Sequence, residues 1–171
     1  MKLSTLLLMA SALFGFLSHA SADPLKVGDA APVISGVTDA GVVLNLGEVY
    51  QKNAYTVVWF YPRALTGGCT KQGCSLRDAA AELAKYNVAV VGVSTDSVEK
   101  QKEFKETNHF PFPLIADTEK KVMKAFGQSA LLMASRECYV INQEGKIVYK
   151  DTGVTHKQAD NVLAFLASQK K

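Results

Sequence analysis

Two nearly continuous runs of β-branched and aromatic residues constrain the fold of this chain more than any other feature. The first run covers residues 55–61 and the second covers residues 88–94. Such runs are typical of strands that are buried on both faces of a parallel sheet. The segment between the runs carries apolar residues at helical spacing, namely Leu76, Ala79, Ala80 and Leu83. The pattern therefore predicts a right-handed β-α-β unit.

Further elements complete a single α/β domain. Residues 96–99 resemble a capping box and predict a charged, solvated helix that runs towards Asn108. A short edge strand at 112–115, a brief helix around 122–126 and a β-hairpin over 137–150 follow. The last helix is predicted by apolar residues spaced at i, i+3, i+4 and i+7, namely Ala159, Val162, Leu163 and Leu166. This order is the layout of a thioredoxin-like fold, in which helices flank a central mixed sheet.

The N-terminal segment has the pattern of a secretory signal peptide. Its only charge is Lys2, an apolar stretch follows over residues 3–17, and small residues end it at Ala22. The pattern predicts cleavage after Ala22, which leaves one domain over residues 23–171. The alternative is a retained membrane anchor, but the apolar stretch is shorter than the roughly 20 residues that a bilayer requires. We therefore expect an exported, soluble protein, which is periplasmic in a two-membrane bacterium.

Charge and cysteine content narrow the function classes. The formal net charge is +3 at pH 7, and loss of Lys2 with the predicted signal peptide brings it closer to neutral, so a nucleic-acid partner is not expected. All 3 cysteines lie after the predicted cleavage site, at Cys69, Cys74 and Cys138. In an oxidising compartment, an odd number of cysteines in a chain long enough to build a core favours redox chemistry over a structural disulfide framework.

Cys69 stands where the first buried run gives way to the helix that follows it. A free thiol with a pKa near 8.5 is only about 3% ionised at pH 7, but helix N-terminal amides and a nearby cation lower that pKa. Gly67 and Gly68 have no Cβ, so backbone N–H groups can approach a small substrate closely. The alternative is a buried, unreactive cysteine at a strand–helix junction.

The segment around Cys69 resembles the active site of the peroxiredoxins. Pro62, Thr66 and Cys69 match that family's pattern of proline, three residues, threonine or serine, two residues and cysteine. Arg136 stands immediately before a predicted strand, as the family's active-site arginine does. The resemblance covers essentially the whole predicted mature chain. Cys74, five residues after Cys69, is similar to the second cysteine of the Q-type, or bacterioferritin-comigratory-protein, branch.

This resemblance implies a thiol-dependent peroxidase that needs no metal and no organic cofactor. Cys69 would attack hydrogen peroxide or an organic hydroperoxide and become a sulfenic acid. Thr66 would orient the peroxide, Arg136 would stabilise the charges, and Pro62 would shield the site from water. Cys74 would then resolve the sulfenic acid as a Cys69–Cys74 disulfide, which a thioredoxin-like protein would reduce.

A disulfide between two cysteines five residues apart has a geometric consequence. In a continuous helix their Cα atoms would be roughly 8–9 Å apart, beyond the about 7 Å limit for a disulfide. Residues 68–75 are therefore expected to unwind on oxidation. Gly73 lowers helix stability by about 1 kcal/mol relative to alanine, which favours such opening.

Simpler alternatives exist for each residue. Thr66 would only cap the helix, Arg136 would form a surface ion pair, and Pro62 would only end a strand. Cys138 is either a second resolving thiol or, the interpretation we favour, a small buried hydrophobic side chain. Gly67 departs from the Q-type branch, which carries a proline there, and this affects loop rigidity and rate rather than the type of reaction.

Two other functions remain open. An exported thioredoxin-like disulfide reductase or isomerase would carry Cys-x-x-Cys, whereas four residues separate Cys69 and Cys74. A copper chaperone on a thioredoxin fold would use two close cysteines and a distant histidine. His109 and His156 lie in polar segments that are typical of surface residues rather than of soft-metal ligands. No apolar stripe requires a dimer, so a monomer is expected.

Overall fold

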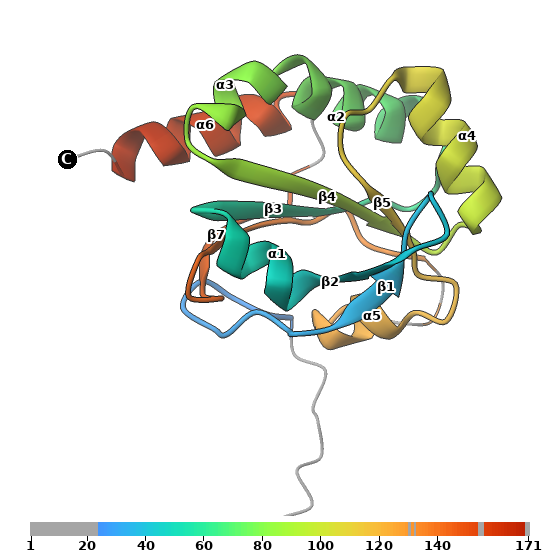
Figure 1. The fold of residues 1–171 in the computed structure, drawn as a ribbon, viewed down its shortest axis with the longest axis horizontal. Helices are drawn as coiled ribbons and strands as arrows, with labels where there is room; N and C mark the ends of the chain where they lie inside the picture. The colour runs from blue at the N-terminus through green and yellow to red at the C-terminus, as the bar shows by residue number, and fades with distance from the viewer. Residues whose placement is uncertain (1–23, 130, 132, 154–155, 170–171) are drawn as a thin grey trace, which may run out of the picture.

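The computed structural model describes residues 24–129, 131, 133–153 and 156–169, so the predicted signal peptide lies outside the described residues. A five-stranded mixed sheet in the order β5-β4-β3-β6-β7 forms the centre of the molecule (Figure 1). The central strand β3 runs parallel to β4 and antiparallel to β6. The strands of this sheet are β3 Tyr55–Phe60, β4 Val88–Ser94, β5 Leu114–Ala116, β6 Cys138–Asn142 and β7 Ile147–Asp151.

Helices cover both faces of this sheet (Figure 1). On one face lie α2 Gly67–Asp78, α3 Ala80–Ala84, α4 Val98–Asn108 and α6 Gln158–Gln169. On the other face lie α1 Leu46–Lys52, α5 Lys121–Ala125 and a two-stranded sheet of β1 Ser35–Val37 and β2 Val43–Asn45. None of the described helices has the length and apolar character to cross a bilayer.

The sheet separates two hydrophobic cores, and β3 contributes to both. Val57 and Trp59 pack with the core that α2 and α6 cover, while Val58 and Phe60 pack with the core under α1 and α5. All four side chains are fully buried. Burial on both faces explains why the run at residues 55–61 is almost continuously apolar instead of alternating.

The predicted thioredoxin-like α/β fold is confirmed, with differences in detail. The crossover between β3 and β4 is two helices, with Ala79 between them, rather than one. Ser97, not Asp96, caps α4, because the Ser97 hydroxyl accepts a hydrogen bond from the Lys100 N–H at 3.3 Å. The sequence did not predict β1, β2 or α1.

Candidate active site

Cys69 is the third residue of α2 and is completely buried. The helix begins after the loop that leaves β3, with Thr66 at the N-cap position. The Thr66 hydroxyl does not cap the helix but donates to the Arg63 carbonyl at 3.0 Å. The capping alternative for its side chain is therefore wrong, and the oxygen of this hydroxyl can still accept a hydrogen bond.

The loop between β3 and Cys69 is held from the end of β4. The Asp96 carboxylate accepts hydrogen bonds from the Ala64 N–H and from the Ser94 hydroxyl, both at 2.7 Å. Leu65, the next residue of the loop, has a left-handed backbone with φ 61°. Any residue other than glycine costs free energy in this left-handed backbone region. Tertiary contacts must therefore maintain the loop, and the hydrogen bond that Asp96 accepts from Ala64 is one of them.

Arg136 reaches the first turn of α2 from the segment before β6. A Cβ placed on Gly68 would lie 2.9 Å from the Arg136 Nη2 atom, so the guanidinium lies directly over the residue that precedes Cys69. The close approach requires a residue without a side chain at position 68. Gly67, by contrast, has open space where its Cβ would be. The structure therefore brings Arg136 to the turn that carries Cys69, rather than to a surface ion pair.

Two buried glutamines connect this arginine to the last helix. Gln72 accepts a hydrogen bond from Arg136 Nη1 at 3.4 Å and donates one to Gln158 at 2.6 Å. The Gln72 and Gln158 side chains are 1% and 0% exposed, so these bonds are shielded from water. The Ser75 hydroxyl also accepts from the Ala159 N–H at 3.1 Å. The middle of α2 is thus joined to the start of α6.

Both cysteines of the predicted redox pair are free and lie in one continuous helix. Cys69 is buried and Cys74 is partly buried, and both fall within Gly67–Asp78. A bond between them therefore requires the helix to open. The structure also shows what opening disrupts: a Cβ on Gly73 would lie 2.5 Å from the Phe110 ring and 3.1 Å from the Trp59 ring. Gly73 thus lowers the stability of the helix through its low helix propensity. Because it has no side chain, it also lets two aromatic rings pack closely against the helix.

Cys138 lies at the start of β6, opposite Trp59 in the register, and is fully buried. Burial raises the pKa of its thiol far above the ordinary value, and the nearby Asp151 carboxylate raises it further. A thiol that does not ionise is a poor nucleophile. This environment favours the interpretation of Cys138 as a core side chain.

Replacing Cys138 with alanine should leave turnover in the peroxidase reaction that the resemblance implies within about twofold of the parent, because the residue contributes packing rather than chemistry. Steady-state peroxide consumption with a dithiol reductant measures the effect, and thermal unfolding provides the control for lost packing. A loss of about tenfold or more in turnover with unchanged stability would instead assign a redox role to Cys138.

The copper-chaperone alternative depends on where the two histidines lie. His109 is exposed at the end of α4, and His156 is exposed before α6. Within the ranges that the structure describes, no group of three or more His, Cys, Asp or Glu side chains is placed to hold a metal ion. The arrangement around Cys69 instead offers a buried thiol, a helix N-terminus and a guanidinium.

Comparisons with known proteins agree on one family. Residues 27–150 match the model of the AhpC/TSA family. Peroxiredoxin Bcp of Bacillus subtilis (strain 168) is 33% identical over 132 residues, which cover 72% of this chain and 83% of that protein.

Solved structures agree with that match. The crystal structure of Peroxidoxin BcpB from Mycobacterium tuberculosis superimposes with a TM-score of 0.80 and 32% identity, covering 86% of this chain and 99% of the other. A structure of the Xanthomonas campestris bacterioferritin comigratory protein, described for its alkyl peroxide reduction activity, gives a TM-score of 0.74 and 26% identity. That match covers 84% of this chain and 100% of the other.

Proposed function

This chain belongs to the AhpC/TSA family of peroxiredoxins, and on that premise we propose that Cys69 and Cys74 are the two thiols with which it reduces hydroperoxides. Peroxiredoxins are thiol-dependent peroxidases, and that is the function of this protein. The observation that carries the assignment of Cys69 is the placement of Arg136 over Gly68, directly before this buried thiol in the first turn of α2.

In the first step, the Cys69 thiolate attacks one oxygen of the peroxide. The O–O bond breaks, Cys69 becomes a sulfenic acid, and the departing oxygen takes a proton and leaves as water or an alcohol. The guanidinium of Arg136 and the N-terminus of α2 stabilise the negative charge on the thiolate and on the departing oxygen. Thr66 accepts a hydrogen bond from the peroxide, because its own hydrogen is directed to the Arg63 carbonyl. Pro62, partly buried after β3, limits access of water.

In the second step, Cys74 resolves the sulfenic acid. The Cys74 thiolate attacks the Cys69 sulfur, the S–O bond breaks, and the hydroxide that leaves becomes water after taking a proton. The helix opens over residues 68–75 to allow the bond. A thioredoxin-like dithiol then reduces the disulfide by thiol–disulfide exchange and is itself oxidised to a disulfide.

The substrate range is tested by steady-state turnover with hydrogen peroxide, an alkyl hydroperoxide and a lipid hydroperoxide side by side. The assay uses a chelator and a thioredoxin-type reductant, so that metal-dependent peroxide decay is absent. We expect turnover with hydrogen peroxide and with at least one organic hydroperoxide, and little reduction of insulin. Insulin reduction without peroxide turnover would instead support the disulfide-reductase alternative.

We also propose that the protein is exported and acts after removal of residues 1–22. The support is the sequence pattern of Lys2, the apolar stretch and the small residues that end at Ala22. An exported enzyme has no direct access to cytosolic thioredoxin, so its reductant would be an exported thioredoxin-like protein.

Expression in a two-membrane bacterium should give a periplasmic protein whose first residue is Asp23, because the signal peptidase would cut after Ala22. Intact-mass measurement of the periplasmic fraction tests the cleavage site. A variant with Ala20 and Ala22 both replaced by lysine provides the control, since it keeps the apolar stretch but removes the small-residue exit. Recovery of the parent with Met1 intact in the membrane fraction would contradict the proposal.

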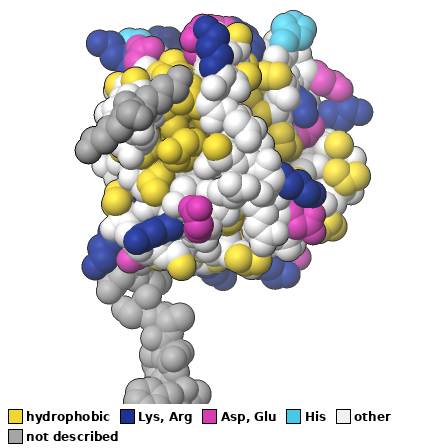
Figure 2. All heavy atoms as spheres, turned by 60° about the vertical axis from the view of Figure 1, so that its left-hand side comes forward, with side chains coloured by type: hydrophobic (Ala, Val, Ile, Leu, Met, Phe, Trp, Pro, Cys, Tyr) yellow, Lys and Arg dark blue, Asp and Glu magenta, His cyan; other side chains and the backbone are white. Residues whose placement is uncertain are grey.

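A monomer is the proposed state in solution. On the face shown in Figure 2, charged side chains of both signs are scattered, and hydrophobic side chains gather mainly in one area at the upper left. The exposed large hydrophobic residues that the structure describes also include Val33, Leu131 and Val43, which lies opposite Val37 in the β1–β2 pair. Light scattering coupled to gel filtration, under reducing and oxidising conditions, measures the mass.

A further inference from the structure

Gln158, the first residue of α6, is completely buried, and no step described above uses it. Its Oε1 atom accepts a hydrogen bond from Nε2 of Gln72 at 2.6 Å. The Oε1 atom of Gln72 in turn accepts one from Nη1 of Arg136 at 3.4 Å. These three side chains therefore form a chain of hydrogen bonds that runs from the last helix to the guanidinium over the first turn of α2.

The arginine fixes the direction of this chain. A guanidinium donates hydrogen bonds and accepts none, so the oxygen of the Gln72 amide has to face Arg136. The nitrogen of the same amide then faces Gln158, which has to offer it an acceptor. If Gln158 offered a donor instead, the Gln72 amide would turn over and present its N–H groups to the guanidinium. The oxygen of Gln158 therefore holds the Gln72 amide in the orientation that accepts from Arg136.

The amide nitrogen of Gln158 has no comparable use. Among the residues that the structure describes, its Nε2 atom is buried without a hydrogen-bond partner. A buried donor without a partner costs free energy, and an apolar side chain of similar size, such as methionine, would avoid that cost. Packing therefore does not account for an amide at this position, whereas the need for an acceptor beside Gln72 does.

We propose that Gln158 is a positioning residue for the reaction with peroxide, and that it acts through Gln72 to hold Arg136 at the first turn of α2. This inference rests on the proposed function, because it assigns the amide chain to the step in which Cys69 attacks the peroxide. Gly68 leaves room for the guanidinium, and Gln72 fixes it through Nη1. These contacts belong to the folded helix, which in the proposed mechanism opens only after the first step.

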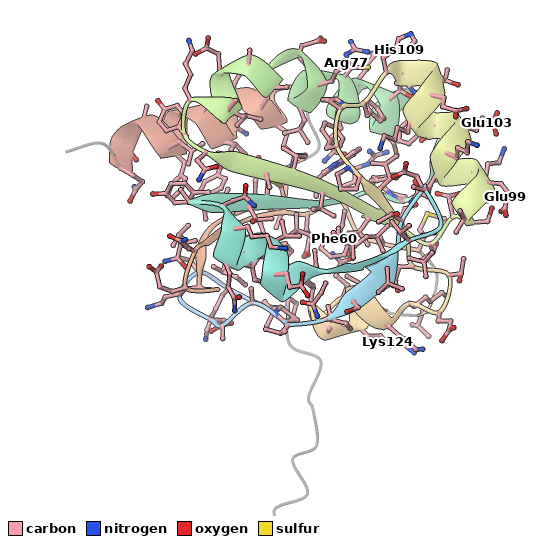
Figure 3. All side chains as sticks on the ribbon, viewed as in Figure 1. Phe60, Arg77, Glu99, Glu103, His109 and Lys124 are labelled. Atoms are coloured by element: carbon pink, nitrogen blue, oxygen red, sulfur yellow. The ribbon has the colours of Figure 1, made fainter. Side chains whose placement is uncertain are left out.

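Other contacts hold α2 in place without touching this chain. The Ser75 hydroxyl accepts a hydrogen bond from the Ala159 N–H at 3.1 Å, which also joins α2 to α6. Arg77, labelled in Figure 3, donates from Nη1 to the Asn108 carbonyl at 2.7 Å and joins the end of α2 to α4. Loss of the Gln158 amide therefore leaves the helix anchored, so its effect should fall on the guanidinium.

The fluorescence of Trp59 can follow the reaction. It is the chain's single tryptophan, and its ring packs against Gly73 of α2. Reduced protein mixed with hydrogen peroxide should give a first phase whose rate rises in proportion to the peroxide concentration. The slope is the rate constant for oxidation of Cys69, and the Cys69→Ser variant should lose this phase.

The test compares Gln158→Met with Ser75→Ala, since each removes one hydrogen bond between α2 and α6. We expect Gln158→Met to lower the rate constant of the first phase by about three- to tenfold, the effect of losing one hydrogen bond that positions a charged group. Ser75→Ala should keep the parental rate constant, because its hydrogen bond does not lead to Arg136. Thermal unfolding of both variants measures what each lost bond contributes to stability.

Two further variants show the route of the effect. Gln158→Glu keeps an oxygen beside Gln72 and removes the unpaired nitrogen, so it should keep most of the parental rate constant. Gln72→Met breaks the chain at its link to Arg136 and should slow the first phase at least as much as Gln158→Met. The double variant should be no slower than Gln72→Met alone, because two residues that act through one contact are not additive.

The outcomes separate this inference from the proposed function. If Gln158→Met keeps the parental rate constant, or if Ser75→Ala lowers it as much, then Gln158 is a structural anchor and the inference fails. It also fails if the effects of Gln72→Met and Gln158→Met multiply in the double variant. If the first phase persists in Cys69→Ser, the proposed role of Cys69 fails instead. Should Gln158→Met not fold, Gln158→Ala takes its place in the same comparisons.

Discussion

Gly68→Ala should lower the rate constant for reaction of Cys69 with hydrogen peroxide by about tenfold or more while leaving the fold intact. The new methyl group would lie 2.9 Å from Nη2 and 3.4 Å from Cζ of Arg136, so the guanidinium has to move away from the first turn of α2. Loss of one positioned group that stabilises developing charge costs roughly 10²–10³ in rate, and displacement of a flexible side chain costs part of that. Stopped-flow fluorescence of Trp59 measures the rate constant.

Gly67→Ala is the matched control for this variant. It makes the same chemical change one residue earlier, where the new methyl group meets nothing within 4 Å. Both variants gain helix propensity, by up to about 1 kcal/mol, so both should unfold at the parent temperature or above. Only Gly68→Ala should lose rate, and combining it with Arg136→Met should cost little beyond Arg136→Met alone. A parental rate for Gly68→Ala would show that the observed placement of Arg136 is not needed for the reaction.

Cys74→Ser should consume one equivalent of peroxide and then stop, with a loss of turnover of about hundredfold or more when a thioredoxin-type reductant is present. Without a second thiol, the sulfenic acid on Cys69 persists and is oxidised further to a sulfinic acid by additional peroxide. Trapping with a sulfenic-acid reagent, followed by intact-mass analysis, identifies the stalled species.

The comparison variant for this experiment is Cys138→Ala, which also removes a thiol but should turn over normally. Cys138 is fully buried and its pKa is raised, so it cannot replace Cys74 as a resolving thiol without a large change in structure. If Cys74→Ser keeps normal turnover with the thioredoxin-type reductant, the protein works through Cys69 alone, and the two-cysteine mechanism is wrong.

Sequence patterns predicted the elements whose burial produces a recognisable pattern of apolar residues within the element itself. The runs at 55–61 and 88–94 are apolar because both faces of β3 and β4 are covered. The short strands β1 and β2 leave no such pattern, since residues such as Val43 are 72% exposed. The position of Cys69, where the first buried run gives way to the crossover helix, was sufficient to predict a thiol in the first turn of that helix.

The polar contacts that support the site could not be predicted in this way, because each joins distant parts of the chain. Asp96 lies 32 residues from Ala64, and Gln72 lies 86 residues from Gln158. No local pattern distinguishes Asp96, which holds the loop before Cys69, from an ordinary helix cap. The packing of the Phe110 ring against Gly73 could not be predicted either, because it joins distant residues. The local sequence indicated only that a glycine lowers helix stability.

Reaction of Cys69 with peroxide, followed by resolution by Cys74 within the same chain, leaves a disulfide that can be mapped. The experiment treats the reduced protein with one equivalent of hydrogen peroxide, without reductant, and maps the disulfides by mass spectrometry. Hydrogen exchange is followed on the same sample. We expect a Cys69–Cys74 disulfide within one chain, a free thiol at Cys138 and faster amide exchange over residues 68–76. A disulfide that contains Cys138, or an oxidised Cys69 beside a free Cys74, would contradict this expectation.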